Sequence, residues 1–247
     1  MVMDNGQPNS CEAHYKILHA ACGDVLEASF LNQNEELQRT SHTFISDYEI
    51  WSEVLSQQSE VVVFKAAIKE YQYALLSLTT GQYRQAYVGL RLFFELSMAT
   101  LYFSGNELEL QNWLQGRKDI LWRPLIDIDN GVLSKVFVRA FFEELSNEAP
   151  RYRAIAEKVY RECSEYVHGN AHTHQVLPDT LSFSEDAFTT WHEQAKNIRT
   201  IVLFCLSARY LKFVDVSSTP KIQEITMEEL GHIDVLRAFF GGAVEQK

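Results

Sequence analysis

The sequence EVVVFKAAIKEYQYALLSLTTGQYRQAYVGLRLFFELSMATLYF, residues 60–103, indicates the class of fold. Apolar side chains recur at intervals of three and four on both sides of Thr80-Gly81, a spacing typical of the buried side of an α-helix. The pattern predicts long helices over residues 60–79 and 82–103. Thr80-Gly81 leaves room only for a tight turn between them. The stretch therefore predicts a helical hairpin, and an all-α protein around it.

Helical periodicity continues on both sides of this hairpin. Ser182 and Glu185 resemble a capping box at the start of one further helix. Residues 112–131 hold several breakers and predict a loop, whereas residues 176–183 allow one short β-hairpin around Pro178-Asp179. The pattern predicts an all-α multi-helix bundle of about seven to nine helices. Outside the hairpin, the expected helices cover residues 11–31, 44–57, 132–146, 149–168, 182–205 and 227–240.

The domain organisation follows from the absence of an internal linker. We expect residues 1–216 to form one domain, with its core at about 60–213, because no Pro/Gly/Ser-rich stretch divides them. Residues 217–247 are predicted to form a polar linker and a short amphipathic C-terminal helix. One side of that helix carries Leu230, Ile233, Leu236 and Phe240. This apolar side can dock on its own domain or on a partner protein, and the sequence leaves both open.

Charge and cysteine usage restrict the classes of function. The 247-residue chain has a net charge of −11, so it offers no global positive field for nucleic acid. A nucleic-acid role would need a local site, and basic residues do gather between Arg117 and Arg161. The four cysteines form no C-x-x-C pair, which favours reduced thiols. No apolar run approaches the roughly 20 residues of a membrane span, so we expect a cytoplasmic protein without membrane contact.

Two chemically active side chains stand seven residues apart near the end of the helix predicted at 149–168. Seven residues are two turns, so Arg161 and His168 differ by roughly 20° around the axis and lie about 10 Å apart along it. Ser164 and Glu165 belong to the same polar stripe, and Gly169-Asn170 ends the helix. A guanidinium can bind a phosphate while an imidazole moves a proton beside it. The stripe thus suggests a metal-free ribonuclease, or alternatively a solvated helix face.

A charged pair interrupts the most apolar helix. Between Ala86 and Phe103 the only charged residues are Arg91 and Glu95, one turn apart. Because burial of an unpaired charge is costly, these two side chains are expected to pair with each other or to find partners nearby. One interpretation is a self-sufficient structural ion pair. The other is that Arg91 reaches across to the stripe that contains Arg161.

Short motifs in this chain resemble the HEPN superfamily. The first runs from Gly81-Gln82-Tyr83-Arg84-Gln85-Ala86 to Leu90-Arg91-Leu92-Phe93-Phe94-Glu95, and the second runs from Tyr160 to His168-Gly169. More narrowly, the chain is similar to bacterial HEPN-like proteins of abortive-infection and other phage-defence loci. The resemblance covers residues 60–210. It implies a helical protein of a bacterial defence or toxin–antitoxin type system.

The resemblance also implies a reaction. HEPN nucleases carry an arginine followed after four to six residues by a histidine, dimerise so that two motifs face one cleft, and cut RNA without metal. Carried over to this chain, Arg161 would hold the scissile phosphate and His168 would act as general acid or base. Arg91, Glu95, Ser164 and Glu165 would be supporting residues. Glu165 could also pair with Arg161 and weaken its hold on phosphate.

Other chemistries have weaker patterns. There is no G-x-S-x-G or phosphate-binding loop, and Cys163 lies off the polar stripe. Three histidines resemble a zinc site, but Gly169-Asn170 breaks the helix between them. Two Glu-x-x-His pairs resemble part of a di-metal carboxylate bundle, and chance accounts for this number of pairs. We therefore predict no metal and no cofactor. The residues concerned are His168, His172 and His174 for zinc, and Glu165/His168 and Glu229/His232 for the di-metal template.

One alternative function remains open at this stage. The protein could be a non-catalytic helical interaction subunit that binds a partner protein of a defence complex. In that case the acidic surface and the tail helix at 226–240 would make the contact. The ribonuclease hypothesis instead predicts a homodimer, RNA as substrate, and an antitoxin or other defence protein as partner.

Overall fold

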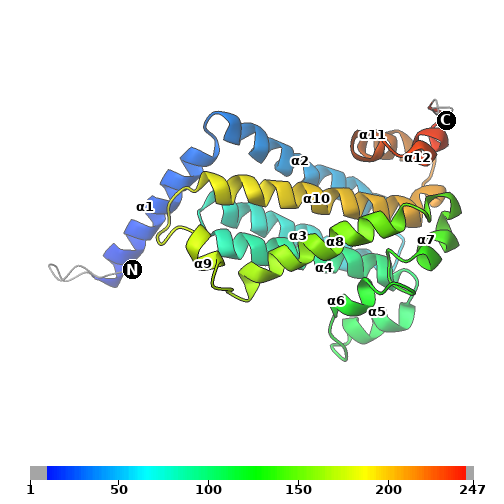
Figure 1. Ribbon diagram of the computed structural model, residues 1–247, viewed down its shortest axis with the longest axis horizontal. Helices are drawn as coiled ribbons and strands as arrows, with labels where there is room; N and C mark the ends of the chain where they lie inside the picture. Colours follow the sequence, from blue (N-terminus) through cyan, green and yellow to red (C-terminus); the bar gives the residue numbers. More distant parts are fainter. Residues whose placement is uncertain (1–9, 243–247) are drawn as a thin grey trace.

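The structure is a computed structural model that describes residues 10–242, and within that range it contains helices but no β-strand. The long helices lie side by side in an elongated bundle (Figure 1). The all-α multi-helix prediction is confirmed: twelve α-helices lie in the described range, nine of them seven residues or longer. Their bounds are α1 Cys11–Ser29, α2 Gln33–Val54, α3 Val61–Thr79, α4 Tyr83–Phe103, α5 Glu107–Leu114, α6 Trp122–Leu125, α7 Lys135–Phe141, α8 Ala149–Val167, α9 Thr173–Val176, α10 Glu185–Tyr210, α11 Thr219–Leu230 and α12 Asp234–Phe239.

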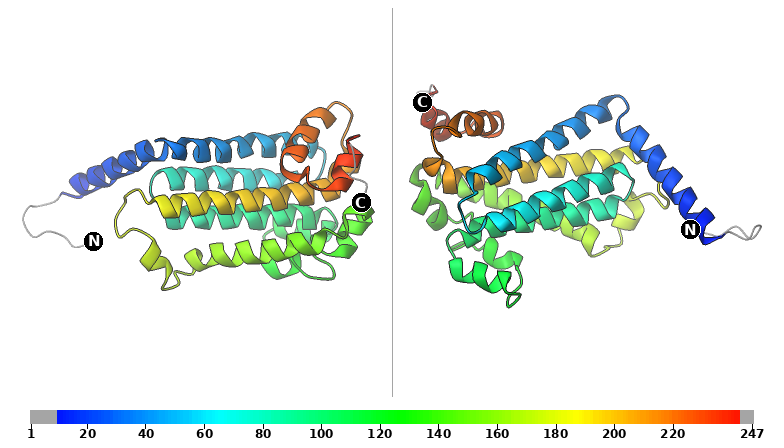
Figure 2. Two further views of the ribbon diagram at one scale, coloured as in Figure 1. Left: turned by 45° about the horizontal axis from the view of Figure 1, so that its top comes forward. Right: turned by 180° about the vertical axis from the view of Figure 1, so that it is seen from behind.

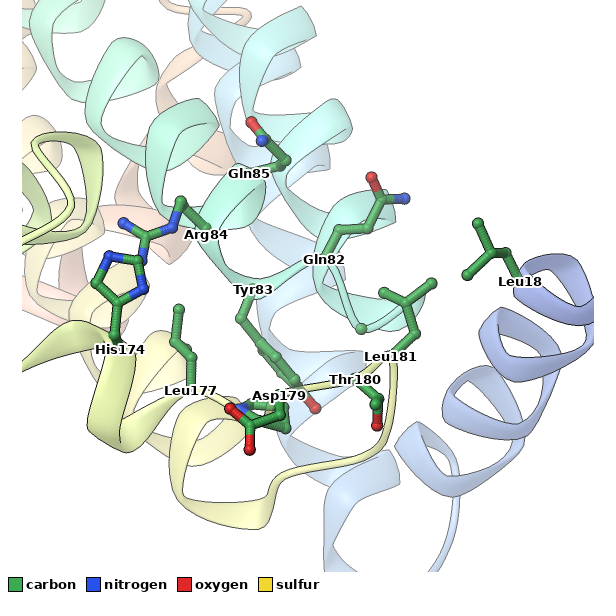
Figure 3. Close-up of a pocket in the computed structure, with 12 residues that line it drawn as sticks. Leu18, Gln82, Tyr83, Arg84, Gln85, His174, Leu177, Asp179, Thr180 and Leu181 are labelled. Carbon is green, nitrogen blue, oxygen red and sulfur yellow. The ribbon is translucent and has the colours of Figure 1, made fainter. Parts of the chain in front are cut away.

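Helices α3 and α4 form the predicted hairpin. Gly81 reverses the chain with a φ of 75°, a conformation that favours glycine over every residue with a Cβ. Further along, a Cβ added at Gly89 would lie 3.0 Å from the Cβ of Ala74, so these two small residues let the helix backbones approach closely. The turn and the start of α4 also line a cavity at this end of the bundle (Figure 3).

The C-terminal half of helix α10 is surrounded by other helices. It packs against α4, α2, α8 and α11, and two views of the bundle show it between these elements (Figures 1 and 2). Every residue from Ile201 to Ala208 is buried in this arrangement. A helix that is apolar on all sides must be covered on all sides. The C-terminal half of α10 therefore depends on its neighbours, α11 among them.

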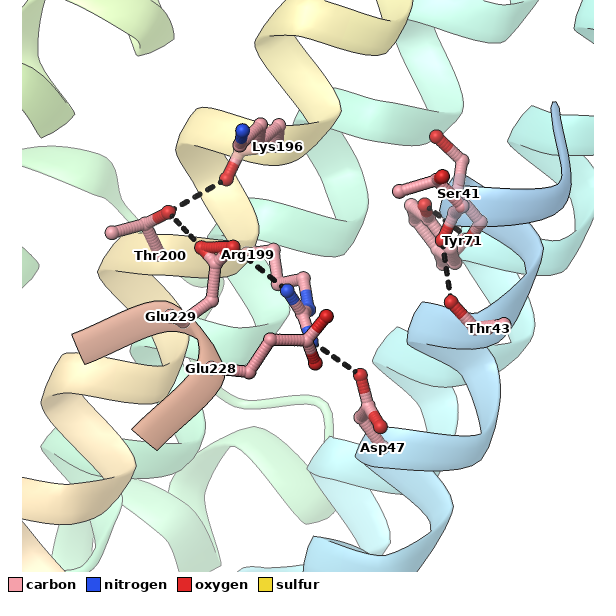
Figure 4. Close-up of polar contacts among 10 residues, drawn as sticks. Ser41, Thr43, Asp47, Tyr71, Lys196, Arg199, Thr200, Glu228 and Glu229 are labelled. Atoms are coloured by element: carbon pink, nitrogen blue, oxygen red, sulfur yellow. Dashed lines mark hydrogen bonds and ion pairs between the residues drawn. The ribbon is translucent and has the colours of Figure 1, made fainter. Parts of the chain in front are cut away.

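A buried ion cluster fixes α11 to the bundle (Figure 4). Arg199 of α10 is 3% exposed, and its guanidinium lies 2.8 Å from Asp47 Oδ2 of α2. From α11, Glu229 Oε1 lies 2.8 Å and Glu228 Oε2 lies 3.1 Å from the same guanidinium. Glu229 also accepts a hydrogen bond of 2.7 Å from Thr200 Oγ1. One cation thus joins three helices.

The C-terminal segment differs from its prediction. Residues 226–240 do not form one helix: α11 starts earlier, at Thr219, and the chain breaks at Gly231 before α12. A Cβ at Gly231 would lie 2.4 Å from the carbonyl oxygen of Met227, so this turn requires glycine. The apolar side of the tail packs on its own bundle, where Ile222, Ile225, Leu230, Ile233 and Leu236 join the main core.

Other predicted boundaries also need correction. No hairpin forms at residues 176–183, where the short helix α9 is followed by irregular chain. Helix α2 begins at Gln33 and not at residue 44. The sequence does not reveal its first half, because the polar residues Gln38 and Ser41 face the core and interrupt the apolar periodicity. The predicted loop at 112–131 contains the end of α5 and all of α6. Helix α10 is capped by Ser184, whose Oγ accepts from the Ala187 N–H, and not by Ser182.

No helix of the described residues combines the length and apolar character needed to cross a membrane.

Replacement of Arg199 by methionine should lower the free energy of unfolding by about 3–5 kcal/mol, because the largely buried carboxylates of Asp47 and Glu229 would lose their cation. Urea denaturation followed by circular dichroism measures this. Lys196→Met, on the exposed side of the same helix, is the matched control and should change little. A loss below about 1 kcal/mol in Arg199→Met would contradict the role given to the cluster.

Candidate functional site

The orientation of α8 places the predicted stripe on the outside of the bundle. Tyr152, Ala156, Val159 and Cys163 are buried at intervals of four, three and four, and they face α4 and α10. At about 100° per residue, Arg161 and His168 lie on the opposite side of the helix. Both residues are exposed.

The end of α8 follows from Gly169. This residue has a φ of 63°, and the backbone N–H of Asn170 returns to the carbonyl oxygen of Glu165 at 3.1 Å. Such a left-handed glycine after the last turn is a common helix terminator. His168 is the C-cap residue, so its imidazole stands at the very end of the stripe.

The polar neighbours of Arg161 are engaged elsewhere. Within the described residues, the side chains of Arg161 and His168 form no hydrogen bond or ion pair. Glu165, which the sequence placed within reach of Arg161, lies 2.9 Å from Nε2 of His172 instead. Ser164 Oγ donates to the carbonyl oxygen of Tyr160 at 2.6 Å. The guanidinium is therefore available to a ligand from solvent.

Arg91 and Glu95 lie away from this stripe. They pair with each other at 3.0 Å across one turn of α4. The hydroxyl of Tyr160 lies 2.7 Å from Arg91 Nη2 and donates to Glu95 Oε1 at 2.6 Å. Burial, together with Glu95, raises the pKa of Tyr160 to about 12. The interpretation that Arg91 reaches the stripe is therefore wrong: the pair contacts α8 through Tyr160, on the flank that faces α4.

The structure also places the residues of the weaker sequence patterns, which are Cys163 and the candidate metal ligands. Burial raises the pKa of the Cys163 thiol to about 12, which keeps it protonated and unreactive at neutral pH. Glu229 binds Arg199, while His232 Nε2 lies 3.3 Å from the hydroxyl of Tyr152, so this Glu-x-x-His pair does not converge. Between residues 10 and 242, no three His, Cys, Asp or Glu side chains are grouped so that they could hold a metal ion.

A cavity of about 500 Å³, which the sequence analysis does not predict, lies beside the end of α8 (Figure 3). It is not lined by Arg161 or His168. Arg84 stands in its wall and donates hydrogen bonds to the carbonyl oxygen of Tyr166 and, at 3.2 Å, to Thr173 Oγ1. Its lining residues come from four separate parts of the chain: Leu18, Gly81, Gln82, Tyr83, Arg84, Gln85, His174, Leu177, Pro178, Asp179, Thr180 and Leu181.

A serine and a histidine that are distant in sequence also meet in the core. Ser41 Oγ lies 2.6 Å from Nδ1 of His192, and the carbonyl oxygen of Ser41 accepts from the hydroxyl of Tyr71 at 2.9 Å. A serine beside an imidazole resembles an activated nucleophile. Ser41 is only 2% and His192 only 4% exposed, so no substrate reaches the pair. We interpret it as a structural link between α2 and α10.

Comparison of the chain with protein-family models, with curated proteins and with solved structures found no match.

The buried imidazole of His192 should make stability depend on pH. Burial lowers its pKa from 6.5 to about 4, so between these values the unfolded chain binds a proton that the folded chain does not. Stability present above pH 6.5 is therefore lost as the pH falls towards 4, by about 1.4 kcal/mol per pH unit. Urea denaturation at several pH values should show a shallower fall for His192→Asn. The exposed His42→Asn variant is the control, and equal slopes in all three proteins would contradict this assignment.

Proposed function

We propose that this protein is a HEPN-like, metal-independent endoribonuclease with Arg161 and His168 as its chemical pair. One observation carries the proposal: both side chains are exposed on one face of α8 and neither has a partner within the described residues. The nearby carboxylate of Glu165 is held by His172, which leaves the charge of Arg161 for a phosphate.

The proposed chemistry is attack of a ribose 2′-hydroxyl on the adjacent phosphate. The O2′–P bond forms and the P–O5′ bond breaks, so the products carry a 2′,3′-cyclic phosphate and a 5′-hydroxyl. Arg161 binds the phosphate and stabilises the charge that develops on its oxygens. His168 either accepts the proton of the 2′-hydroxyl or donates a proton to the leaving O5′. Ser164 and Glu165 flank the pair.

Further cations on α8 support RNA binding to this face. Arg151 and Lys158 are exposed on the same outer side of the helix as Arg161. From residue 151 to residue 168 the row extends about 25 Å. Lys158 lies 3.8 Å from Glu162, whereas Arg151 and Arg161 have no ion-pair partner within the described residues. In a protein with a net charge of −11, these two arginines supply local attraction that the molecule as a whole does not provide.

We propose that a second copy of the chain completes the site. A single helix face contacts RNA from one side only, and the cavity beside the end of α8 is not lined by Arg161 or His168. A homodimer that brings two α8 faces together would form a cleft around the phosphate. The resemblance further supports a cytoplasmic role in bacterial defence or a toxin–antitoxin system, with a defence protein or antitoxin as partner.

Purified protein should cleave RNA in the presence of EDTA, and His168→Asn should reduce the rate by about 10²–10⁴ because the proton-transfer group is lost. Arg161→Gln should also abolish most cleavage. Gel analysis of a substrate panel that includes tRNA measures the rates, and phosphatase sensitivity identifies cyclic ends. His42→Asn, an exposed histidine on α2, is the matched control. An inactive wild type, or His168→Asn with full activity, would refute the proposal.

A second candidate function is that of an interaction subunit without catalysis. The sequence predicts that the tail at 226–240 makes the contact, but in the structure a different surface is exposed for it. The apolar side of the tail is already buried on its own bundle. In contrast, the first half of α1 projects beyond the bundle (Figures 1 and 2). It exposes 64% of Tyr15. We propose that a second copy packs on the side of α1 that carries Tyr15.

The variant Tyr15→Ser should therefore shift the protein towards a monomer of 28.5 kDa. Sedimentation velocity at several concentrations measures the change, and a fall of about tenfold in dimer affinity is expected from the loss of one aromatic contact. Leu108→Ser, which alters an exposed apolar residue on α5, is the control. If Tyr15→Ser and wild type sediment alike, α1 is not the contact.

A further inference from the structure

The cavity beside α9 contains a cation whose charge is not balanced. Arg84 is partly buried, and its guanidinium donates only to neutral oxygens, the Tyr166 carbonyl and Thr173 Oγ1. No carboxylate of the described residues lies within ion-pair distance of it. A guanidinium has five N–H donors, so donors remain after these two contacts. Because partly buried charges are usually paired, an anion from outside the chain is the missing partner.

The position of Arg84 in its helix strengthens this requirement. It lies in the first turn of α4, where the helix dipole disfavours a cation. The N-cap residue Gln82 makes no side-chain cap, so α4 receives no compensation from its own cap. An anion bound at Arg84 would balance the guanidinium and this helix end together.

A second nitrogen donor stands beside the guanidinium. Arg84 and His174 lie next to each other at one side of the cavity (Figure 3). Both approach Gly169: a Cβ placed there would be 3.5 Å from Arg84 Nη1 and 3.6 Å from His174 Nε2. Two nitrogen groups that converge in this way suit the oxygens of a phosphate better than a single carboxylate oxygen. Gly169 follows His168, so the cavity adjoins the end of α8.

The rest of the lining suits an organic body with hydroxyl groups. Leu177, Pro178 and Leu181 provide apolar wall, while the exposed carboxylate of Asp179 can accept hydrogen bonds from hydroxyls. A volume of about 500 Å³ lies within the range of small-molecule sites. We propose that this cavity binds a small sugar phosphate, with the phosphate on Arg84 and His174 and the sugar towards Asp179. The inference goes beyond the proposed cleavage of RNA and does not depend on it.

Calorimetric titration of the full chain with ribose 5-phosphate, and separately with ribose, tests this inference. The phosphate ester should bind and ribose should not, because the charge of Arg84 selects the phosphate. His174→Glu should weaken binding at least tenfold by introducing repulsion, and Arg84→Gln should weaken it by more. Asp179→Asn should lower the affinity for the sugar phosphate less than either. Arg123→Gln, an exposed arginine on α6, is the matched control and should bind like wild type.

Because Arg84 also holds the Tyr166 carbonyl, His174→Glu provides the decisive variant if Arg84→Gln does not fold. His174 is exposed and makes no hydrogen bond through its side chain within the described residues, so its replacement should leave the fold intact. Equal heats from ribose and ribose 5-phosphate, or wild-type affinity in His174→Glu, would overturn the proposal. RNA cleavage measured on the same variants reports separately on the function proposed for Arg161 and His168.

Discussion

Burial of the C-terminal half of α10 on every side is the constraint on which the rest of the bundle depends. Residues 201–208 have no polar side that could face water, so α2, α4, α8 and α11 must cover them. Arg199 lies just before this segment and cannot be buried alone. Its charge requires Asp47 from α2 and Glu229 from α11, which fixes the positions of both helices. The tail is therefore part of the core, and its apolar side is not available to a partner.

The same physical reasoning explains which elements the sequence could predict. Helices α3, α4, α8 and α10 were predicted well because their buried positions are apolar and recur at intervals of three and four. The first half of α2 is not predicted by the sequence, because Gln38 and Ser41 face the interior, where Ser41 contacts His192. Such a partner lies 151 residues away, and no local pattern reports it. The break at Gly231 depends on one backbone contact, which periodicity does not register.

The sequence likewise predicts some features of the candidate site and not others. The exposure of Arg161 and His168 follows from the buried side of α8, so it could be predicted once the helix was recognised. The contact of Arg91 with Tyr160 could not be predicted from the sequence. Tyr160 has an apolar ring and a polar hydroxyl, so it can lie on either the buried or the exposed side of a helix. The cavity was out of reach because Leu18, Arg84, His174 and Asp179 meet only after two turns and a loop have folded. A cation in the first turn of α4 was its one local signal.

An acidic protein can act on a phosphate only where its own carboxylates are kept away. At physiological ionic strength charges are screened beyond about 8 Å, so the net charge of −11 matters less at contact than the nearest side chains do. For Arg161 the critical neighbour is Glu165, one turn further along α8. His172 holds that carboxylate at 2.9 Å, and His172 is positioned by the turn that Gly169 makes possible. Gly169, which ends α8, thereby keeps the guanidinium of Arg161 available. The turn at Gly169 also brings His174 beside Arg84. Termination of α8 is thus the local event that links both phosphate-binding proposals.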